Sequence, residues 1–155
     1  RSINTFLVLS SLLFFAGCSS LQVTEESIAN QNVAGVSLAS KSTATQAVLA
    51  NAVVYFEYDK FNLTAKSIQA LKGVSELMQR NPKITLSIEG HADERGTREY
   101  NLALGQRRAE SVANYLIANS ISRNRLTAKS YGEERPLALG SNDSAWSKNR
   151  RVEIK

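Results

Sequence analysis

The chain has 155 residues, 43% of them hydrophobic and 21% charged, an ordinary balance that argues against wholesale disorder and against several membrane spans. Its 19 basic and 14 acidic residues give a net charge of +5, which favours anionic partners without identifying one. The single cysteine and the single histidine exclude an internal disulfide, a cysteine-rich zinc site and a multi-histidine metal site.

An apolar run, FLVLSSLLFFA, occupies residues 6–16. It is shorter than the roughly 20 residues that a membrane-spanning helix needs, and it fits the apolar core of a secretion signal. Arg1 is the only charge before the run and no initiator Met precedes it, so we expect the true start to lie upstream. Residues 1–17 are therefore predicted to be a signal peptide.

Small residues precede the only cysteine, in the order Phe15-Ala16-Gly17-Cys18. This order resembles the lipobox of bacterial lipoproteins, with Phe15 where the usual box has leucine. The resemblance implies cleavage before Cys18 and three acyl chains on that cysteine, enough for a lasting membrane anchor. The alternative is a plain signal peptide with an incidental cysteine. In that family, Asp directly after the cysteine tends to retain lipoproteins at the inner membrane. Ser19 stands there instead, so the resemblance implies an outer-membrane protein, and we expect its domain to lie in the periplasm.

A flexible tether is expected over residues 18–50, following the lipidated cysteine. Residues 19–50 are rich in Ser, Ala, Thr, Gln and Asn, contain no Pro and show no sustained apolar period. A transient helix near 44–50 is compatible with the sequence. A coil of this length spans about 30 Å root mean square, so a domain at 51–155 can work away from the membrane.

The first half of that domain alternates strand and helix patterns. Val53–Tyr58 is β-branched and aromatic, which predicts a strand. A helix follows, capped by Asn62 or Thr64, and ends at Asn81-Pro82. Residues 84–88 alternate apolar and polar side chains, which predicts a half-buried strand.

The second half continues the alternation. Residues 99–119 carry the apolar stripe of a second helix, and residues 126–131 predict a third strand. A short helical turn is expected at 144–148 and a last short strand at 151–155. The order predicts an α+β fold, a two-layer β-α-β-α-β sandwich in which two main helices cover one face of a mixed sheet.

The densest polar stretch runs from Glu89 to Asn101, between a predicted strand and a predicted helix. Loops held by a scaffold commonly carry binding residues. Carboxylates for acid–base chemistry are present, but the sequence offers no nucleophile–base constellation, no phosphate-binding loop and no second histidine. We therefore expect no enzyme activity, no cofactor and no metal. Nucleic acid is not an expected partner, because an exported chain does not meet the genome.

Several single residues are assigned structural roles. His91 is expected to be structural, with a neutral imidazole that bridges two backbone groups. Trp146 is expected to anchor local packing rather than to present a ligand platform. Gly90, Gly96 and Gly132 are expected to serve turns.

Four ordered motifs resemble the OmpA-like peptidoglycan-binding domain family, and in particular the lipoproteins of the Tol–Pal envelope system. They are VYFEYDKFNLT (54–64), GHADERGTREYNLALGQRRA (90–109), SYGEERP (130–136) and SKNRRVEI (147–154). The resemblance covers essentially all of 51–155. Asn119-Ser120-Ile121 stands where the family often has Gly-Val, and the family often has Glu in place of Asp143 or Ser144. These departures concern loop shape and partner contacts, not the ligand motif.

The resemblance implies non-covalent binding of peptidoglycan stem peptides through meso-diaminopimelate. Asp93 would take the ammonium of the ligand, and Arg108 would take its carboxylate. The other pocket residues that the resemblance implies are Asp59, which would line the pocket, and Tyr58, Ala92 and Leu104, which would be contacts.

The chemistry of the ligand agrees with this pair. The free end of diaminopimelate carries an ammonium beside a carboxylate, so its site needs a fixed anion and a fixed cation a few ångströms apart. Arginine offers a bidentate fork for the carboxylate. Asp93 and Arg108 converge if the loop between them folds back. Lysine in place of diaminopimelate removes the carboxylate, at a cost of about 1–3 kcal/mol. We expect alanine at either position to abolish retention on sacculi without unfolding the domain.

Two roles remain open. As a binding module, the chain would tether the outer membrane to the cell wall within the Tol–Pal system, which serves envelope integrity and cell division. As an interaction protein, its main ligand would be another envelope protein, which the resemblance identifies as TolB, docked on the peptidoglycan-binding face. Competition between TolB and a stem peptide for the domain discriminates between the two roles.

Overall fold

The computed structural model describes residues 48–49 and 52–155. The expected signal peptide, Cys18 and most of the expected tether lie outside these residues. Among the residues described, no helix combines the length and apolar character that a membrane crossing requires.

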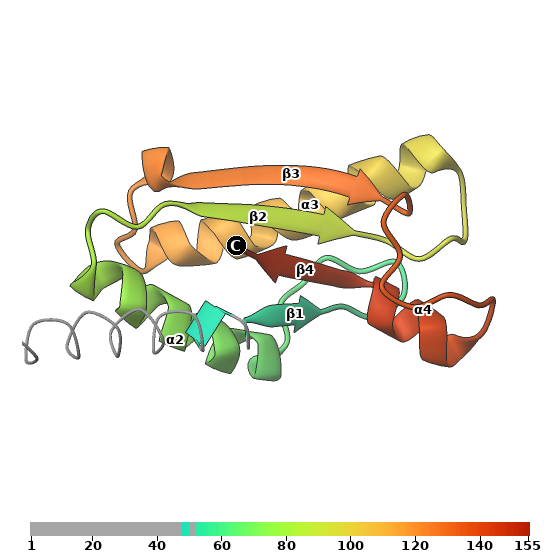
Figure 1. Cartoon of the computed structure of the whole chain (residues 1–155), viewed down its shortest axis with the longest axis horizontal. Coiled ribbons are helices and arrows are strands. Elements are labelled where there is room, and N and C mark those ends of the chain that lie inside the picture. Colours follow the sequence, from blue (N-terminus) through green and yellow to red (C-terminus); the bar gives the residue numbers. More distant parts are fainter. Residues whose placement is uncertain (1–47, 50–51) are drawn as a thin grey trace, which may run out of the picture.

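One mixed sheet contains the strands of this region, in the order β1-β4-β2-β3. Its strands are β1 (Val53–Tyr55), β2 (Leu86–His91), β3 (Leu126–Gly132) and β4 (Arg151–Ile154). β2 and β3 run parallel, whereas β4 lies antiparallel to both β1 and β2. The last strand of the chain therefore sits in the middle of the sheet and joins the first strand to the rest (Figure 1).

Helices connect the strands. They are α2 (Ala65–Arg80), α3 (Arg98–Ala118), the 3-10 turn η1 (Arg123–Arg125) and α4 (Asp143–Asn149). Thr64 caps the N-terminus of α2 and Thr97 that of α3. The hydroxyl of each accepts the backbone N–H of the residue three positions later. In Figure 1, α3 runs along β2 and β3, and α2 lies beside β1.

In the part of the chain that the structure describes, a hydrophobic core lies between the helices and the sheet. Leu71 and Met78 of α2, Val112 and Leu116 of α3, and Ile88 of β2 are fully buried in it. The partly buried Val48 and Leu49 pack against the same core, upstream of the expected domain start at residue 51.

The predicted α+β architecture is confirmed, and the ends of the first two strands differ most from the prediction. β1 ends at Tyr55 instead of residue 58, because its pairing with β4 stops there and the chain turns at Asp59 with a φ of 56°. β2 continues to His91, because Gly90 and His91 still pair with β3 across a register shift.

A close contact of two glycines sets the distance between α3 and the sheet. A Cβ on Gly90 would lie 1.9 Å from the carbonyl oxygen of Gly105, far inside any real contact distance. The expectation that Gly90 serves a turn is therefore wrong: it lies within β2 and lets the backbone of α3 rest directly on the strand. This contact brings the first turns of α3 to the end of β2, where the candidate site lies.

Candidate functional site

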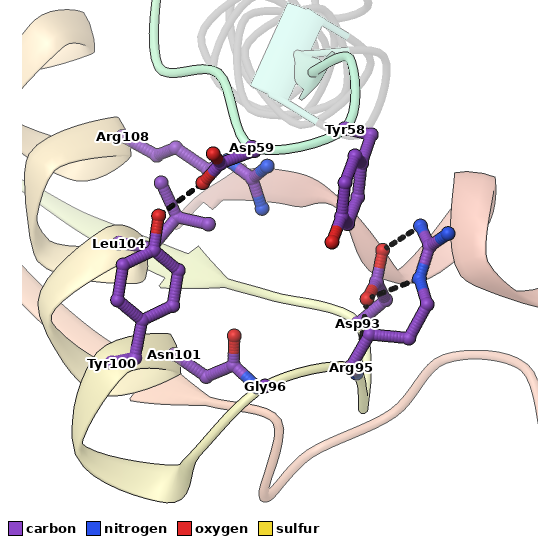
Figure 2. Close-up of a pocket in the computed structure, with 9 residues that line it drawn as sticks. All are labelled: Tyr58, Asp59, Asp93, Arg95, Gly96, Tyr100, Asn101, Leu104 and Arg108. Atoms are coloured by element: carbon purple, nitrogen blue, oxygen red, sulfur yellow. Dashed lines mark hydrogen bonds and ion pairs between the residues drawn. The ribbon is translucent and has the colours of Figure 1, made fainter.

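A cavity of about 150 Å³ opens where β1 and β2 end and α3 begins (Figure 2). Residues expected from the sequence line it: Tyr58, Asp59, Asp93, Leu104 and Arg108. These side chains come from the loop after β1, the loop after β2 and the helix α3. The fold thus brings together residues that lie far apart along the chain.

Ala92 is placed differently from the other expected contacts. It is 2% exposed, at the end of β2, and its backbone N–H donates to the carbonyl oxygen of Gly132 at 2.8 Å. It is not among the residues that line the cavity.

Asp93 is a buried carboxylate held by two arginines. Its Oδ1 accepts the backbone N–H of Arg95 at 3.1 Å and Arg95 Nε at 3.0 Å. Its Oδ2 accepts Arg95 Nη2 at 2.7 Å and Arg150 Nη1 at 3.3 Å. Burial opposes ionisation of Asp93, but the hydrogen bonds from Arg95 and Arg150 outweigh it and hold the pKa of this carboxyl below its usual value.

Arg108 is a fully buried guanidinium that hydrogen-bonds backbone carbonyls. Its Nε donates to Lys60 O at 2.8 Å, its Nη1 to His91 O at 2.9 Å and its Nη2 to Glu57 O at 3.1 Å. Burial lowers the pKa of Arg108 to about 10, although the nearby charge of Asp93 opposes this, so the group is charged at neutral pH.

Arg108 lines the cavity. Within the described part of the chain, no carboxylate forms an ion pair with it. A guanidinium carries five N–H donors, and the contacts above use three of them. Two donors of a buried cation that lines a cavity are therefore left for an anionic group.

Asp59 and Tyr100 close one side of the cavity (Figure 2). The hydroxyl of Tyr100 donates to Asp59 Oδ1, which links the loop after β1 to α3. This hydrogen bond raises the pKa of Tyr100. The sequence places Tyr100 in its densest polar stretch but gives it no role, because its partner lies in another loop.

Arg95 lines the opposite side, between two aromatic rings. Its guanidinium carbon lies 4.1 Å from the ring centroid of Tyr58 and 4.1 Å from that of Trp146. Trp146 is fixed in turn, since its indole Nε1 donates to Glu94 Oε1 at 3.0 Å. Sequence reasoning missed Arg95, although its position two residues after Asp93 on a short loop is a usable signal.

His91 lies behind the cavity, and one expectation about it is wrong. Neither ring nitrogen has a hydrogen-bond partner among the described residues, so the imidazole bridges no backbone groups. The ring is 2% exposed and stacks on Tyr131 with the centroids 5.6 Å apart. Burial, followed by the charge of Arg151, lowers the pKa of His91 to about 4, so the ring is neutral at pH 7.

Glu89, His91 and Glu153 place their ligand atoms within 4.8 Å of one another, close enough to hold a metal ion. The carboxylates already have cationic partners, however. Lys155 Nζ lies 2.9 Å from Glu89 and 2.8 Å from Glu153, and Lys129 Nζ lies 2.9 Å from Glu89. An ammonium group thus bridges the two carboxylates where a metal would bind, so we assign no metal to this cluster.

Comparison with known proteins identifies the family of this chain. Residues 55–150 match the OmpA family. The peptidoglycan-associated lipoprotein of Pasteurella multocida is 38% identical over 149 residues, which cover 96% of this chain and 94% of that protein. The protein of the same name from Brucella melitensis is 46% identical over 99 residues, which cover 64% of this chain and 59% of that protein.

A solved structure has the same fold. The crystal structure of the peptidoglycan-associated lipoprotein from Burkholderia pseudomallei aligns with a TM-score of 0.67 and 37% identity. The alignment covers 69% of this chain and 91% of that one. The chain therefore belongs to the OmpA family, in which its relatives are peptidoglycan-associated lipoproteins.

Proposed function

We propose that this domain binds peptidoglycan without covalent chemistry, by holding the zwitterionic end of meso-diaminopimelate between Asp93 and Arg108. One observation carries the proposal. A buried carboxylate and a buried arginine without a described carboxylate partner line the same cavity of about 150 Å³. The names of the relatives, which describe peptidoglycan-associated lipoproteins, support the same ligand.

Each ionic group of the ligand has a counterpart in the cavity. The ammonium would lie against the carboxylate of Asp93, and the carboxylate would accept the two remaining N–H groups of Arg108. Leu104 and the ring of Tyr58 offer apolar surface to the methylene chain between the ligand's two amino-acid centres. No step of this recognition needs a nucleophile or a metal, so the role is binding.

A titration with two synthetic tripeptides tests the proposal. The probes are L-Ala-γ-D-Glu-meso-diaminopimelate and its L-lysine analogue, added to the full chain in a mild detergent. Loss of the terminal carboxylate leaves Arg108 without its partner, so we expect the lysine peptide to bind more weakly by about 1–3 kcal/mol, roughly 5- to 150-fold. Equal affinities for the two peptides would contradict the proposed site.

Asp93→Asn is the matching variant of the protein. It keeps the size of the side chain but removes the charge that faces the ammonium, so we expect binding of the diaminopimelate peptide to fall below detection. Thermal unfolding of the variant shows whether the fold survives. A folded Asp93→Asn protein that binds like the wild type would overturn the assignment.

The structure revises one expectation about variants. Arg108→Ala removes three hydrogen bonds to buried or half-buried backbone carbonyls as well as the charge. Unsatisfied carbonyls cost stability, so this substitution does not separate binding from folding. Asp93→Asn is the cleaner probe.

In the cell, we propose that the chain links the outer membrane to the wall. Acyl chains on Cys18 would hold it at the outer membrane while the domain grips stem peptides in the periplasm. This arrangement matches a role in the Tol–Pal system. The anchor and most of the tether lie outside the described residues, and the support for the anchor is the sequence pattern at 6–18.

A second role, docking of a protein such as TolB, is favoured by one feature of the cavity's surroundings. Tyr58 and Tyr100 line the cavity with exposures of 58% and 49%, and Phe61, three residues beyond Tyr58, is 39% exposed. Exposed aromatic residues are typical of protein interfaces. Competition between purified TolB and the diaminopimelate tripeptide tests whether both use this face.

A further inference from the structure

We propose that Arg95 is a resident cation that fills the ammonium subsite of the free protein and leaves it when a ligand binds. The inference rests on the proposed function, because it concerns the same carboxylate, Asp93. It adds a residue that sets how tightly any ammonium ligand is held.

The acceptor capacity of Asp93 is fully used. A carboxylate offers about four lone-pair sites. Arg95 supplies one backbone and two side-chain donors, and Arg150 supplies a further one. A ligand ammonium can therefore reach Asp93 only by replacing a donor that is already bound.

Arg150 is the less movable of the two arginines. Its side chain is 15% exposed, and its Nε also donates to the backbone carbonyl of Phe56 at 3.0 Å. Moving it would leave that carbonyl without its hydrogen bond. The side chain of Arg95 is 30% exposed and has no such second hydrogen bond among the described residues. The guanidinium of Arg95 is therefore the donor that exchanges.

The surroundings of Arg95 lower the free-energy cost of moving its guanidinium away from Asp93. The guanidinium carbon lies 4.1 Å from the ring centroid of Tyr58 and 4.1 Å from that of Trp146. An arginine beside an aromatic face keeps a favourable interaction without its carboxylate. The loop that carries Arg95 continues into Gly96, whose φ of 111° gives the backbone a conformation that other residues rarely adopt.

This exchange has a consequence for recognition. Replacing one cation at Asp93 with another gains little free energy, so an ammonium alone is a weak ligand. The net affinity must then come from a second contact, which is the carboxylate at Arg108. Arg95 thus lowers the affinity of every ammonium ligand by a similar factor, and ligands without the carboxylate fall below useful affinity.

The test replaces Arg95 and measures the affinity of the protein for both tripeptides. In Arg95→Gln, Asp93 keeps the backbone donor and Arg150 but loses the guanidinium, so we expect both the diaminopimelate and the lysine tripeptide to bind about tenfold more tightly than to the wild type. Arg95→Lys keeps a cation without the bidentate fork, and we expect an intermediate gain. Arg98→Gln is the control, because it removes the same charge at a different position. The side chain of Arg98 is 66% exposed and pairs with Glu134.

The outcomes separate this inference from the proposed function. If the wild type binds neither peptide, the proposed function fails. If the wild type binds the diaminopimelate peptide and Arg95→Gln binds it equally or more weakly, Arg95 is a ligand contact or a support of the loop, and the inference is overturned. If Arg98→Gln also binds the tripeptides more tightly, the gain in affinity comes from the change in net charge. That result also overturns the inference.

A measurement on the wild type covers the case in which Arg95→Gln does not fold. The Nε–H of Arg95 gives a nuclear magnetic resonance signal that depends on its bond to Asp93. We expect this signal to shift and to exchange faster with solvent when the diaminopimelate tripeptide is added. An unchanged signal at saturation would show that the arginine stays on Asp93.

Discussion

Asp93 and Arg108 are two buried ions of opposite sign that are not joined by an ion pair in the described residues. Burying a charge is costly unless it is compensated. The chain compensates Asp93 with two arginines and Arg108 with three backbone carbonyls. Carbonyl dipoles solvate the guanidinium without neutralising it, so its full charge remains available to an anionic group.

His91 gives a prediction at the same scale. Its pKa is about 4 in the folded chain against 6.5 in the unfolded chain, so the unfolded state binds more protons between these values. Its contribution to stability is therefore complete above pH 6.5 and is lost as the pH falls toward 4. We expect the free energy of unfolding in urea to drop by about 1.5 kcal/mol between pH 6.5 and 5.

His91→Phe is the control for this pH dependence. His91 is the only histidine, and its ring nitrogens have no hydrogen-bond partners among the described residues, so phenylalanine keeps the volume and the stacking on Tyr131. We expect the variant to show no slope between pH 6.5 and 5 and to be at least as stable as the wild type at pH 7. Parallel pH profiles for the two proteins would assign the slope to other groups.

At the scale of elements, the contact of β2 with α3 positions the site. Gly105 lies inside a helix, where glycine is unfavourable by roughly 1 kcal/mol relative to alanine. Its presence is explained by the approach of Gly90, since a Cβ on Gly105 would lie 3.0 Å from Gly90 O and 2.2 Å from Ser130 Oγ. Asp93 lies three residues after Gly90, and Arg108 lies three residues after Gly105. The distance between the strand and the helix therefore sets the distance between the two charges.

Gly90→Ala tests this contact. The added methyl group would lie 1.9 Å from a backbone oxygen, so α3 must move away from β2. We expect a loss of stability of about 3 kcal/mol or more, together with loss of tripeptide binding. Gly73→Ala in α2 is the matched control. Its Cβ would meet only Val48 at 4.0 Å, so we expect a gain of about 0.5–1 kcal/mol. Equal effects of the two substitutions would contradict the packing argument.

Features that depend on neighbouring residues could be predicted from the sequence, and features that depend on distant segments could not. The helices and strands were predictable, because their apolar periods and the cap at Thr64 are local signals. The end of β1 was not, because it depends on how far β4 pairs with it. The contact of Arg95 with both Tyr58 and Trp146 depends on three separate segments meeting, which no local pattern reports.

At the scale of the whole molecule, one small ionic pocket has to hold a protein on a large polymer. A single site of this kind is not required to be tight. The wall presents many identical stem peptides, and an anchored protein meets them at a high effective concentration, so retention can exceed what one site provides. On this view the proposed anchor and the pocket make separate contributions, and each can be removed alone.

Cys18→Ser separates them. Serine cannot carry the thioether-linked lipid, so we expect the full chain to move from the membrane fraction to the periplasmic fraction of the cell. The pocket lies in residues 58–108 and is untouched, so we expect the affinity for the diaminopimelate tripeptide to stay within about twofold of the wild type. Asp93→Asn is the reciprocal variant, retained in the membrane fraction but released from isolated sacculi. If Cys18→Ser remains in the membrane fraction, the lipid anchor is wrong. If it also loses tripeptide binding, anchor and pocket are coupled, and retention is not the product of two independent contacts.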